Sequence, residues 1–159
     1  MAFDSLAFRK ALGQFATGVT VASVKTDAGV HGMTANSFTS VSLEPPLVLV
    51  CVDKTRQTHG LLLAEGRFGI SVLAREHEAV SNWFAGRRGQ AAHFVWRNDV
   101  TVSPVLDGAL AWFDCTLEHA YEGGDHTIFV GRVDRFGTGH GSPLLFFQGR
   151  YTSVAPEEE

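Results

Sequence analysis

The residues with the clearest chemical potential lie in one stretch, residues 32–46, which reads GMTANSFTSVSLEPP. Short hydroxyl and amide side chains recur there, separated only by small or apolar residues. An ordinary turn rarely needs so many donors and acceptors, whereas a segment that lines a polar, planar ligand does. The alternative is an irregular loop whose side chains bond their own backbone. The polar residues of the stretch are Thr34, Asn36, Ser37, Thr39, Ser40 and Ser42.

A second polar stretch, DKTRQTH at residues 53–59, follows the apolar run LVLVCV at 47–52. It brings hydroxyls and cations to the point where a helix is predicted to begin. Free N–H groups and the helix dipole make such a position a natural phosphate site. The alternative is ordinary N-capping by Thr58 beside solvated charges. Together the two stretches predict a ring pocket and a phosphate pocket flanking one strand, which is how a flavin nucleotide would be held.

Among the histidines, His126 is the strongest candidate for a role in a site. It lies in GDHTIFVGRV, at the predicted start of a strand beside Gly123 and Gly124, where a side chain can reach a pocket mouth. The alternative is a turn histidine bonded to Asp125 or to the backbone. His140, in the loop GTGHGSP, ranks lower. The remaining histidines are predicted to be surface or strand residues: His31, His59, His77, His93 and His119.

No Ser/His/Asp arrangement stands out, and no His/Asp pair has the i, i+4 spacing of a helical metal site, so no metal is predicted. Cys51 and Cys115 lie in separate apolar strand patterns, and we expect two buried, reduced thiols. A reaction in which a cofactor performs the difficult chemistry agrees with this pattern, because it needs no side-chain nucleophile.

The elements that must position these residues are mostly strands. Apolar alternation or apolar runs predict strands at 18–25, 47–52, 68–73, 109–121, 127–133 and 144–151. The run at 47–52 is expected to be buried on both faces. In the strand at 109–121, Asp114 is expected on the polar face, opposite Cys115.

Three short helices complete the prediction. Asp4 or Ser5 would cap a helix that ends near Gly18, Thr58 would cap a second that stops at Gly66, and a third covers residues 76–84. The strands follow one another as hairpins, without βαβ alternation. This favours a mostly β fold, a closed or split antiparallel barrel of Greek-key type with peripheral helices.

Length and composition limit the function classes. A chain of 159 residues predicts a single domain, 1–159, with a core at about 8–152. The net charge is −4 and the 13 basic residues are scattered, which argues against a nucleic-acid surface. No signal-peptide pattern and no long apolar run is present, so we expect a cytoplasmic protein that does not enter the membrane.

The sequence resembles the short-chain flavin reductases, the reductase components of two-component flavin-dependent monooxygenases, which are built on the FMN-binding split β-barrel. The resemblance runs from the segment FRKALGQFATGVTV to Tyr151. It rests on GMTANSFTSVSLEPPLVLVCVDKTRQTH, on FGISVL followed by a helix, and on GDHTIFVGRV followed by PLLFFQGRY. The first and third motifs are long and match in order and spacing.

The resemblance assigns roles to individual residues. The isoalloxazine and ribityl groups would be bordered by Thr34, Ala35, Asn36 and Ser37, with main-chain contacts from Ser40 and Val41. The ribityl chain would lie along Cys51, Val52, Asp53 and Lys54, and the phosphate would be bound by Thr55 and Thr58. The pocket would be closed by Phe84 and Arg87. His126 would contact the nicotinamide or the flavin edge, and His140 could help to bind the dinucleotide.

The resemblance also implies partners. FMN or FAD would be reduced by NADH or NADPH in a homodimer, and the reduced flavin would pass to a separate monooxygenase. Two alternatives use the same barrel: a flavin-binding protein without turnover, and an enzyme of the pyridoxamine-phosphate oxidase type. An enzyme of the pyridoxamine-phosphate oxidase type would need several phosphate-binding Arg and Lys residues near the pocket, whereas this sequence has one Arg and one Lys there. A small structural dimer without a ligand is the remaining alternative.

Overall fold

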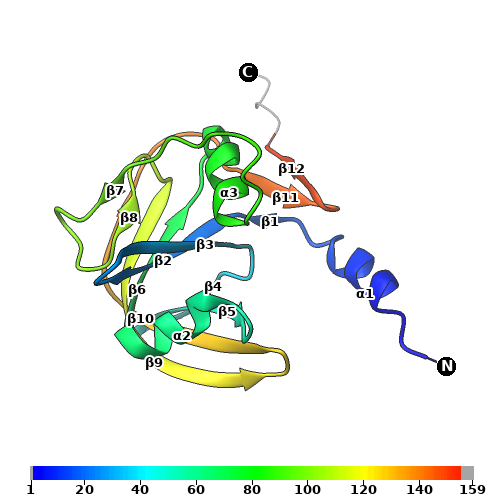
Figure 1. The fold of residues 1–159 in the computed structure, drawn as a ribbon, viewed down its shortest axis with the longest axis horizontal. Coiled ribbons are helices and arrows are strands. Elements are labelled where there is room, and N and C mark those ends of the chain that lie inside the picture. Colours follow the sequence, from blue (N-terminus) through cyan, green and yellow to red (C-terminus); the bar gives the residue numbers. More distant parts are fainter. Residues whose placement is uncertain (1, 155–159) are drawn as a thin grey trace.

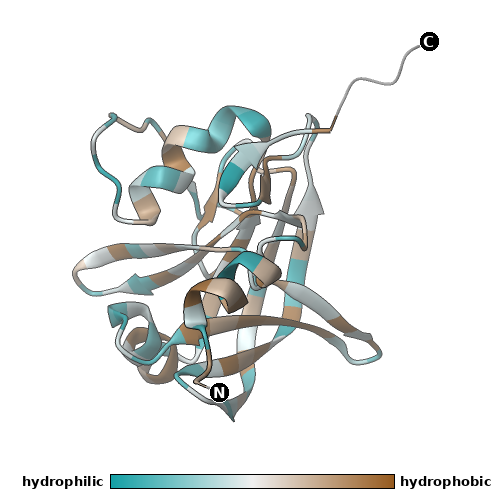
Figure 2. Cartoon of the chain, turned by 90° about the vertical axis from the view of Figure 1, so that its right-hand side faces the viewer, coloured by the Kyte–Doolittle hydropathy of each residue, from teal (hydrophilic) through white to brown (hydrophobic). Residues whose placement is uncertain are grey.

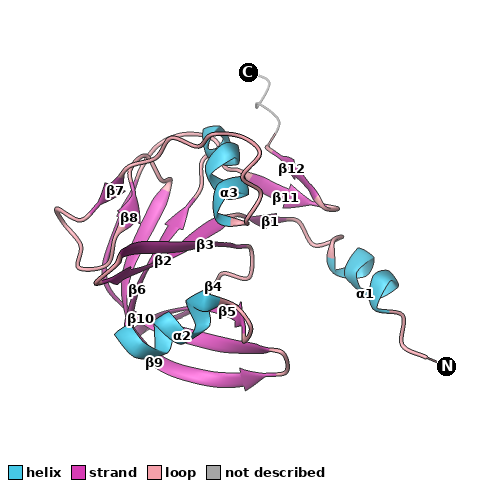
Figure 3. Cartoon of the chain, in the orientation of Figure 1, coloured by secondary structure: helices cyan, strands magenta, loops and turns pink. Residues whose placement is uncertain are grey.

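The computed structural model describes residues 2–154, so residues 1 and 155–159 of the predicted domain lie outside the described part. Strands predominate, as the sequence predicts (Figures 1 and 3). Seven of them form one sheet, in the order β3 (Gly29–Ala35), β2 (Thr20–Thr26), β6 (Arg67–Val72), β9 (Ala111–Gly123), β10 (His126–Thr138), β5 (Pro46–Asp53) and β4 (Thr39–Leu43).

All neighbours in this sheet pair antiparallel, which confirms the predicted mostly β, antiparallel class. The sheet is open, because β3 and β4 stand at opposite ends of its strand order. A smaller sheet joins β1 (Thr17–Gly18), β11 (Leu145–Phe147) and β12 (Arg150–Thr152). A third pairs β7 (Trp96–Arg97) with β8 (Val105–Leu106).

Helix α1 (Ser5–Leu12) begins as predicted, because the Asp4 carboxylate accepts two free N–H groups of its first turn, both at 3.0 Å. The predicted end near Gly18 is wrong. The helix stops at Leu12, since the Gly13 carbonyl accepts the Gln148 N–H and β1 pairs with β11. The helix lies apart from the sheet and buries none of its residues (Figure 1).

Helix α2 (Gln57–Glu65) ends as predicted at Gly66, whose φ of 63° suits glycine. Its predicted cap is wrong, because Arg56 occupies the N-cap position without a side-chain bond, and Thr58 lies inside the first turn. Helix α3 (Glu78–Phe84) follows a single 3₁₀ turn, η1 (Arg75–His77). It lies near the predicted bounds.

Two strand predictions need correction. Strand β5 alternates rather than being buried on both faces: Val48, Val50 and Val52 are buried, whereas Cys51 is only half-buried. The prediction of two buried thiols therefore holds for Cys115 alone. The segment 144–151 is not one strand but the β11–β12 hairpin, which turns at Gln148 and Gly149 with φ of 50° and 77°.

Two packed clusters form the interior. One lies under the central sheet and includes Phe68 and Phe129; the other joins Val80 of α3 to Leu106 and Leu144. Hydrophobic residues run along the interior strands, and the hairpin tips are hydrophilic (Figure 2). The second cluster supports an aromatic group, Phe84, Phe94 and Trp96, that packs against it from outside.

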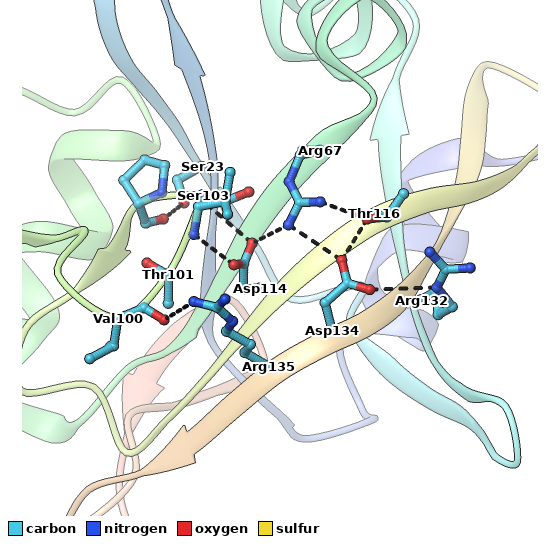
Figure 4. A network of polar contacts seen from close by, with 12 residues as sticks. Ser23, Arg67, Val100, Thr101, Ser103, Asp114, Thr116, Arg132, Asp134 and Arg135 are labelled. Carbon is cyan, nitrogen blue, oxygen red and sulfur yellow. Dashed lines mark hydrogen bonds and ion pairs between the residues drawn. The ribbon is translucent and has the colours of Figure 1, made fainter.

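Asp114 shares the polar face of β9 with Thr116, as predicted, because the Arg67 guanidinium contacts both side chains. This face is covered at Asp114, whose side chain is fully buried. The carboxylate accepts the backbone N–H groups of Val102 and Ser103, and the Arg67 guanidinium contacts it at 3.2 Å (Figure 4). Val102 and Ser103 belong to the connection from α3 to β8, residues 86–104, which we call the strap. Asp114 thus fixes the end of the strap to the sheet.

Candidate functional site

A cavity of about 650 Å³ opens between β3, the end of β5, the start of α2, the end of α3 and the strap. This volume lies within the range of small-molecule and cofactor sites. Its lining includes Val30, His31, Gly32, Met33, Thr34, Ala35, Asn36, Ser37, Cys51, Asp53, Arg56, Gln57, Thr58, Trp83, Phe84, Ala85, Gly86, Arg88, Phe94, Trp96 and His126.

The polar wall of the cavity is held in place by its own hydroxyls. Thr34 donates to the Ser81 carbonyl of α3 at 2.6 Å. Ser37 donates to the Cys51 carbonyl at 3.0 Å and accepts the Cys51 N–H at 3.1 Å. These hydroxyls therefore fix residues 34–37 against α3 and β5, whereas the Asn36 side chain is exposed.

A second part of the cavity lining is aromatic. The Phe84 ring centroid lies 4.9 Å from that of Phe94 and 5.5 Å from that of Trp96, so the strap packs directly on the end of α3. The Phe84 ring also fills the space beside Gly32, where a Cβ atom would lie 2.7 Å from two ring atoms. Glycine is required there because any side chain would push the ring.

At the start of α2, Arg56, Gln57 and Thr58 face the cavity. The Thr58 hydroxyl lies 2.8 Å from Nε2 of His31 on β3, and burial lowers the pKa of His31. The Asp53 carboxylate accepts both the N–H and the hydroxyl of Thr55, each at 2.7 Å. These two bonds are the main reason that the pKa of Asp53 is lowered.

His126 stands at the edge of the cavity with 41% of its side chain exposed. Its Nδ1 lies 2.7 Å from the Asp125 carboxylate, and its backbone pairs with Asp53 across the β5–β10 ladder. His126 is therefore bonded to Asp125, as in the alternative, and also lines the cavity, whereas its contact with the nicotinamide or the flavin stays a prediction.

The structure brings together part of the predicted site. Of the predicted residues, the cavity is lined by Thr34, Ala35, Asn36, Ser37, Cys51, Asp53, Thr58, Phe84 and His126. The other predicted residues lie outside its lining. Ser40 and Val41 lie on the exposed edge strand β4, Val52 is in the core, and Arg87 and His140 are exposed. Lys54 forms an ion pair with Glu122, and the Thr55 hydroxyl donates to the Asp53 carboxylate.

Sequence reasoning missed several lining residues. His31 was predicted at the surface or in a strand, and it lies in β3 and lines the cavity. Its position one residue before the GMTANS motif was the available signal. Phe94 and Trp96 carry no local signal, because only the return of the strap brings them to the cavity. Arg88 was also missed; it follows the end of α3, and its guanidinium lies 4.8 Å over the Trp83 ring.

The cavity contains one thiol, and burial raises the pKa of Cys51. In residues 2–154, no group of three or more His, Cys, Asp or Glu side chains is placed to hold a metal ion. Within the same residues, no helix combines the length and apolar character needed to cross a membrane.

Comparison with known proteins agrees with this geometry. Residues 12–155 match the flavin reductase like domain family. An NADH-dependent flavin reductase of Rhodococcus is 46% identical over 158 residues, covering 94% of this chain and 86% of the relative. The styrene monooxygenase flavin reductase of Pseudomonas putida superposes with a TM-score of 0.86 at 41% identity, covering 95% of this chain and 99% of that one.

A second solved structure is the NADH:FAD oxidoreductase of Streptomyces globisporus in complex with NAD and FAD fragments. It superposes with a TM-score of 0.87 at 39% identity, covering 98% of this chain and 96% of that one. The family match spans most of the chain, and the relatives are matched over nearly their whole length. The chain therefore belongs to the flavin reductase like domain family.

Proposed function

We propose that this protein is an NADH-dependent flavin reductase that binds FMN or FAD in the cavity. The observation that carries the proposal is the cavity itself, whose lining combines polar residues 34–37, an aromatic group around Phe84 and the start of α2. A flavin needs polar partners for its ring heteroatoms, apolar cover for its ring face and a site for its phosphate. The residues present fit these needs.

Each part of the flavin has proposed contacts. Residues 34–37 border the ring, Cys51 and Asp53 follow the ribityl chain, and Thr58 with Arg56 binds the phosphate. When bound, the flavin supplies a ring that accepts hydride from a reduced nicotinamide. The aromatic wall of Phe84 and the strap limits the access of water to that ring, which strengthens electrostatic contacts inside the cavity.

His126 is proposed to position the nicotinamide. Asp125 holds its Nδ1 at 2.7 Å, which fixes the orientation of the imidazole at the cavity edge. An imidazole held in this way can orient the nicotinamide ring over the flavin ring without moving during the reaction. NADH is the expected donor, because the Rhodococcus relative is named for it; NADPH use is decided by the assay below.

We propose further that residues 1–159 form one domain with the FMN-binding split-barrel fold. The protein is proposed to act in the cytoplasm as a homodimer and to supply reduced flavin to a separate monooxygenase.

The dimer is supported by exposed apolar residues on α1 and nearby, including Phe3, Leu6 and Phe15 at 77%, 63% and 79% exposure. Such a surface is typical of an interface. Light scattering should give twice 17.2 kDa, and a monomer that still binds flavin would refute the dimer.

The decisive experiment is a steady-state assay that crosses FMN and FAD with NADH and NADPH. Oxidation of the nucleotide that depends on both protein and flavin supports the proposal. A protein that binds flavin without oxidising NADH or NADPH would be a flavin carrier. A protein that neither binds nor reduces flavin would contradict the proposal altogether.

A further inference from the structure

His31 and Thr58 form a contact between two walls of the cavity. His31 lies on β3 and is half-buried, whereas Thr58 lies in the first turn of α2 and is 1% exposed. His31 Nε2 and Thr58 Oγ1 are 2.8 Å apart. Both residues line the cavity, beside Arg56 and Gln57.

The protonation of His31 decides what the Thr58 hydroxyl can do. Burial lowers the pKa of His31, so its ring is neutral near pH 7 and carries one N–H and one lone pair. When Nε2 carries the proton, it donates to Thr58 Oγ1. The Thr58 hydroxyl then keeps its own proton for a different acceptor.

The charges around this pair favour an anionic acceptor. Arg56 brings a cation to the same part of the lining. Asp53 is the acidic residue in the lining, and its carboxylate is already bonded to the N–H and hydroxyl of Thr55. Its charge is partly compensated, so it opposes a nearby phosphate less than a free carboxylate would.

We propose that His31 is a positioning residue for the flavin phosphate: its Nε2–H donates to Thr58 Oγ1 and thereby directs the Thr58 hydroxyl proton into the cavity toward that phosphate. This inference rests on the proposed function. It assigns to His31 no contact with the flavin ring and no part in hydride transfer.

The chain offers a matched control in His59, which lies one residue after Thr58 on α2. His59 Nε2 lies 2.7 Å from the hydroxyl of Thr127 on β10, and His59 is half-buried like His31. This second His–Thr contact joins α2 to another strand and lies outside the cavity lining. Loss of a His–Thr bond alone can therefore be separated from loss of this one.

The test compares FMN with riboflavin, which differs only in lacking the phosphate. Dissociation constants are measured by flavin fluorescence for the wild-type protein and for His31→Ala, His31→Gln and His59→Ala. We expect His31→Ala to weaken FMN binding roughly tenfold, the effect of one charge-assisted bond, and to leave riboflavin binding nearly unchanged. His31→Gln keeps a donor of similar reach and should restore most of the FMN affinity.

His59→Ala should leave the ratio of the two affinities at its wild-type value. Equal effects of His31→Ala on FMN and riboflavin, or no effect on FMN, would overturn the role of His31 while leaving the flavin site intact. If His31→Ala does not fold, His31→Leu, which removes the donor but fills the space, should show the same selective loss of FMN affinity, and equal effects on FMN and riboflavin would refute the role of His31. A wild-type protein that binds neither flavin would reject the proposed function and this inference together.

Discussion

Asp114 holds three segments together, and removing it is the sharpest test of how the strap is fixed. Its buried carboxylate accepts the Val102 and Ser103 N–H groups at 2.7 and 3.1 Å and contacts Arg67 at 3.2 Å (Figure 4). Asp114→Ala leaves both N–H groups without this acceptor, at about 1 kcal/mol or more each. Arg67 loses one carboxylate but keeps Asp134 at 3.3 Å.

The total loss of unfolding free energy should be about 3 kcal/mol. Breaking a buried ion pair costs roughly 3–5 kcal/mol, and the lower end applies because Arg67 is 34% exposed and retains a second partner. For a chain of this length, such a loss lowers Tm by roughly 6–12 °C. Circular dichroism during heating measures the change directly.

Asp134→Ala is the matched control, because Asp134 contacts the same Arg67 but has 28% of its side chain exposed. We expect it to cost about 1 kcal/mol or less. Asp114→Asn should fall between the two, since its amide oxygen can still accept one N–H. A fall in Tm below about 2 °C for Asp114→Ala, or an equal fall for both alanine variants, would refute the reasoning.

Three further predictions concern the cavity. Gly32→Ala should lower stability by roughly 1–3 kcal/mol and weaken flavin binding, because its Cβ would meet the Phe84 ring at 2.7 Å; unchanged Tm and affinity would contradict this. Thiol titration at pH 7 should be slow for Cys51 and faster at higher pH, while Cys115, whose pKa burial raises to about 12, should react only after unfolding. His126→Ala should raise the KM for NADH and reduce turnover ten- to hundredfold, roughly 1–3 kcal/mol, with flavin affinity little changed; normal kinetics in a less stable protein would remove it from the site.

The sequence alone determined the features that depend on neighbours along the chain. The Asp4 cap, the glycine end of α2 and the β9–β10 turn at Gly124 arise from hydrogen bonds or backbone angles within a few residues. Alternation within a strand likewise predicted the mostly β class. The polar segment at 34–37 was located for the same reason, because its composition is unusual in one continuous stretch.

The tertiary structure decided everything that depends on distant partners. Asp114 is buried because the strap delivers two N–H groups to it, and α1 stops early because β1 pairs with β11. His31 meets Thr58, and Phe94 and Trp96 meet Phe84, across separations that leave no periodic trace in the sequence. The sequence pattern within one strand or helix predicts which face of that element a residue lies on. The packing of the whole chain determines which distant residue covers that face.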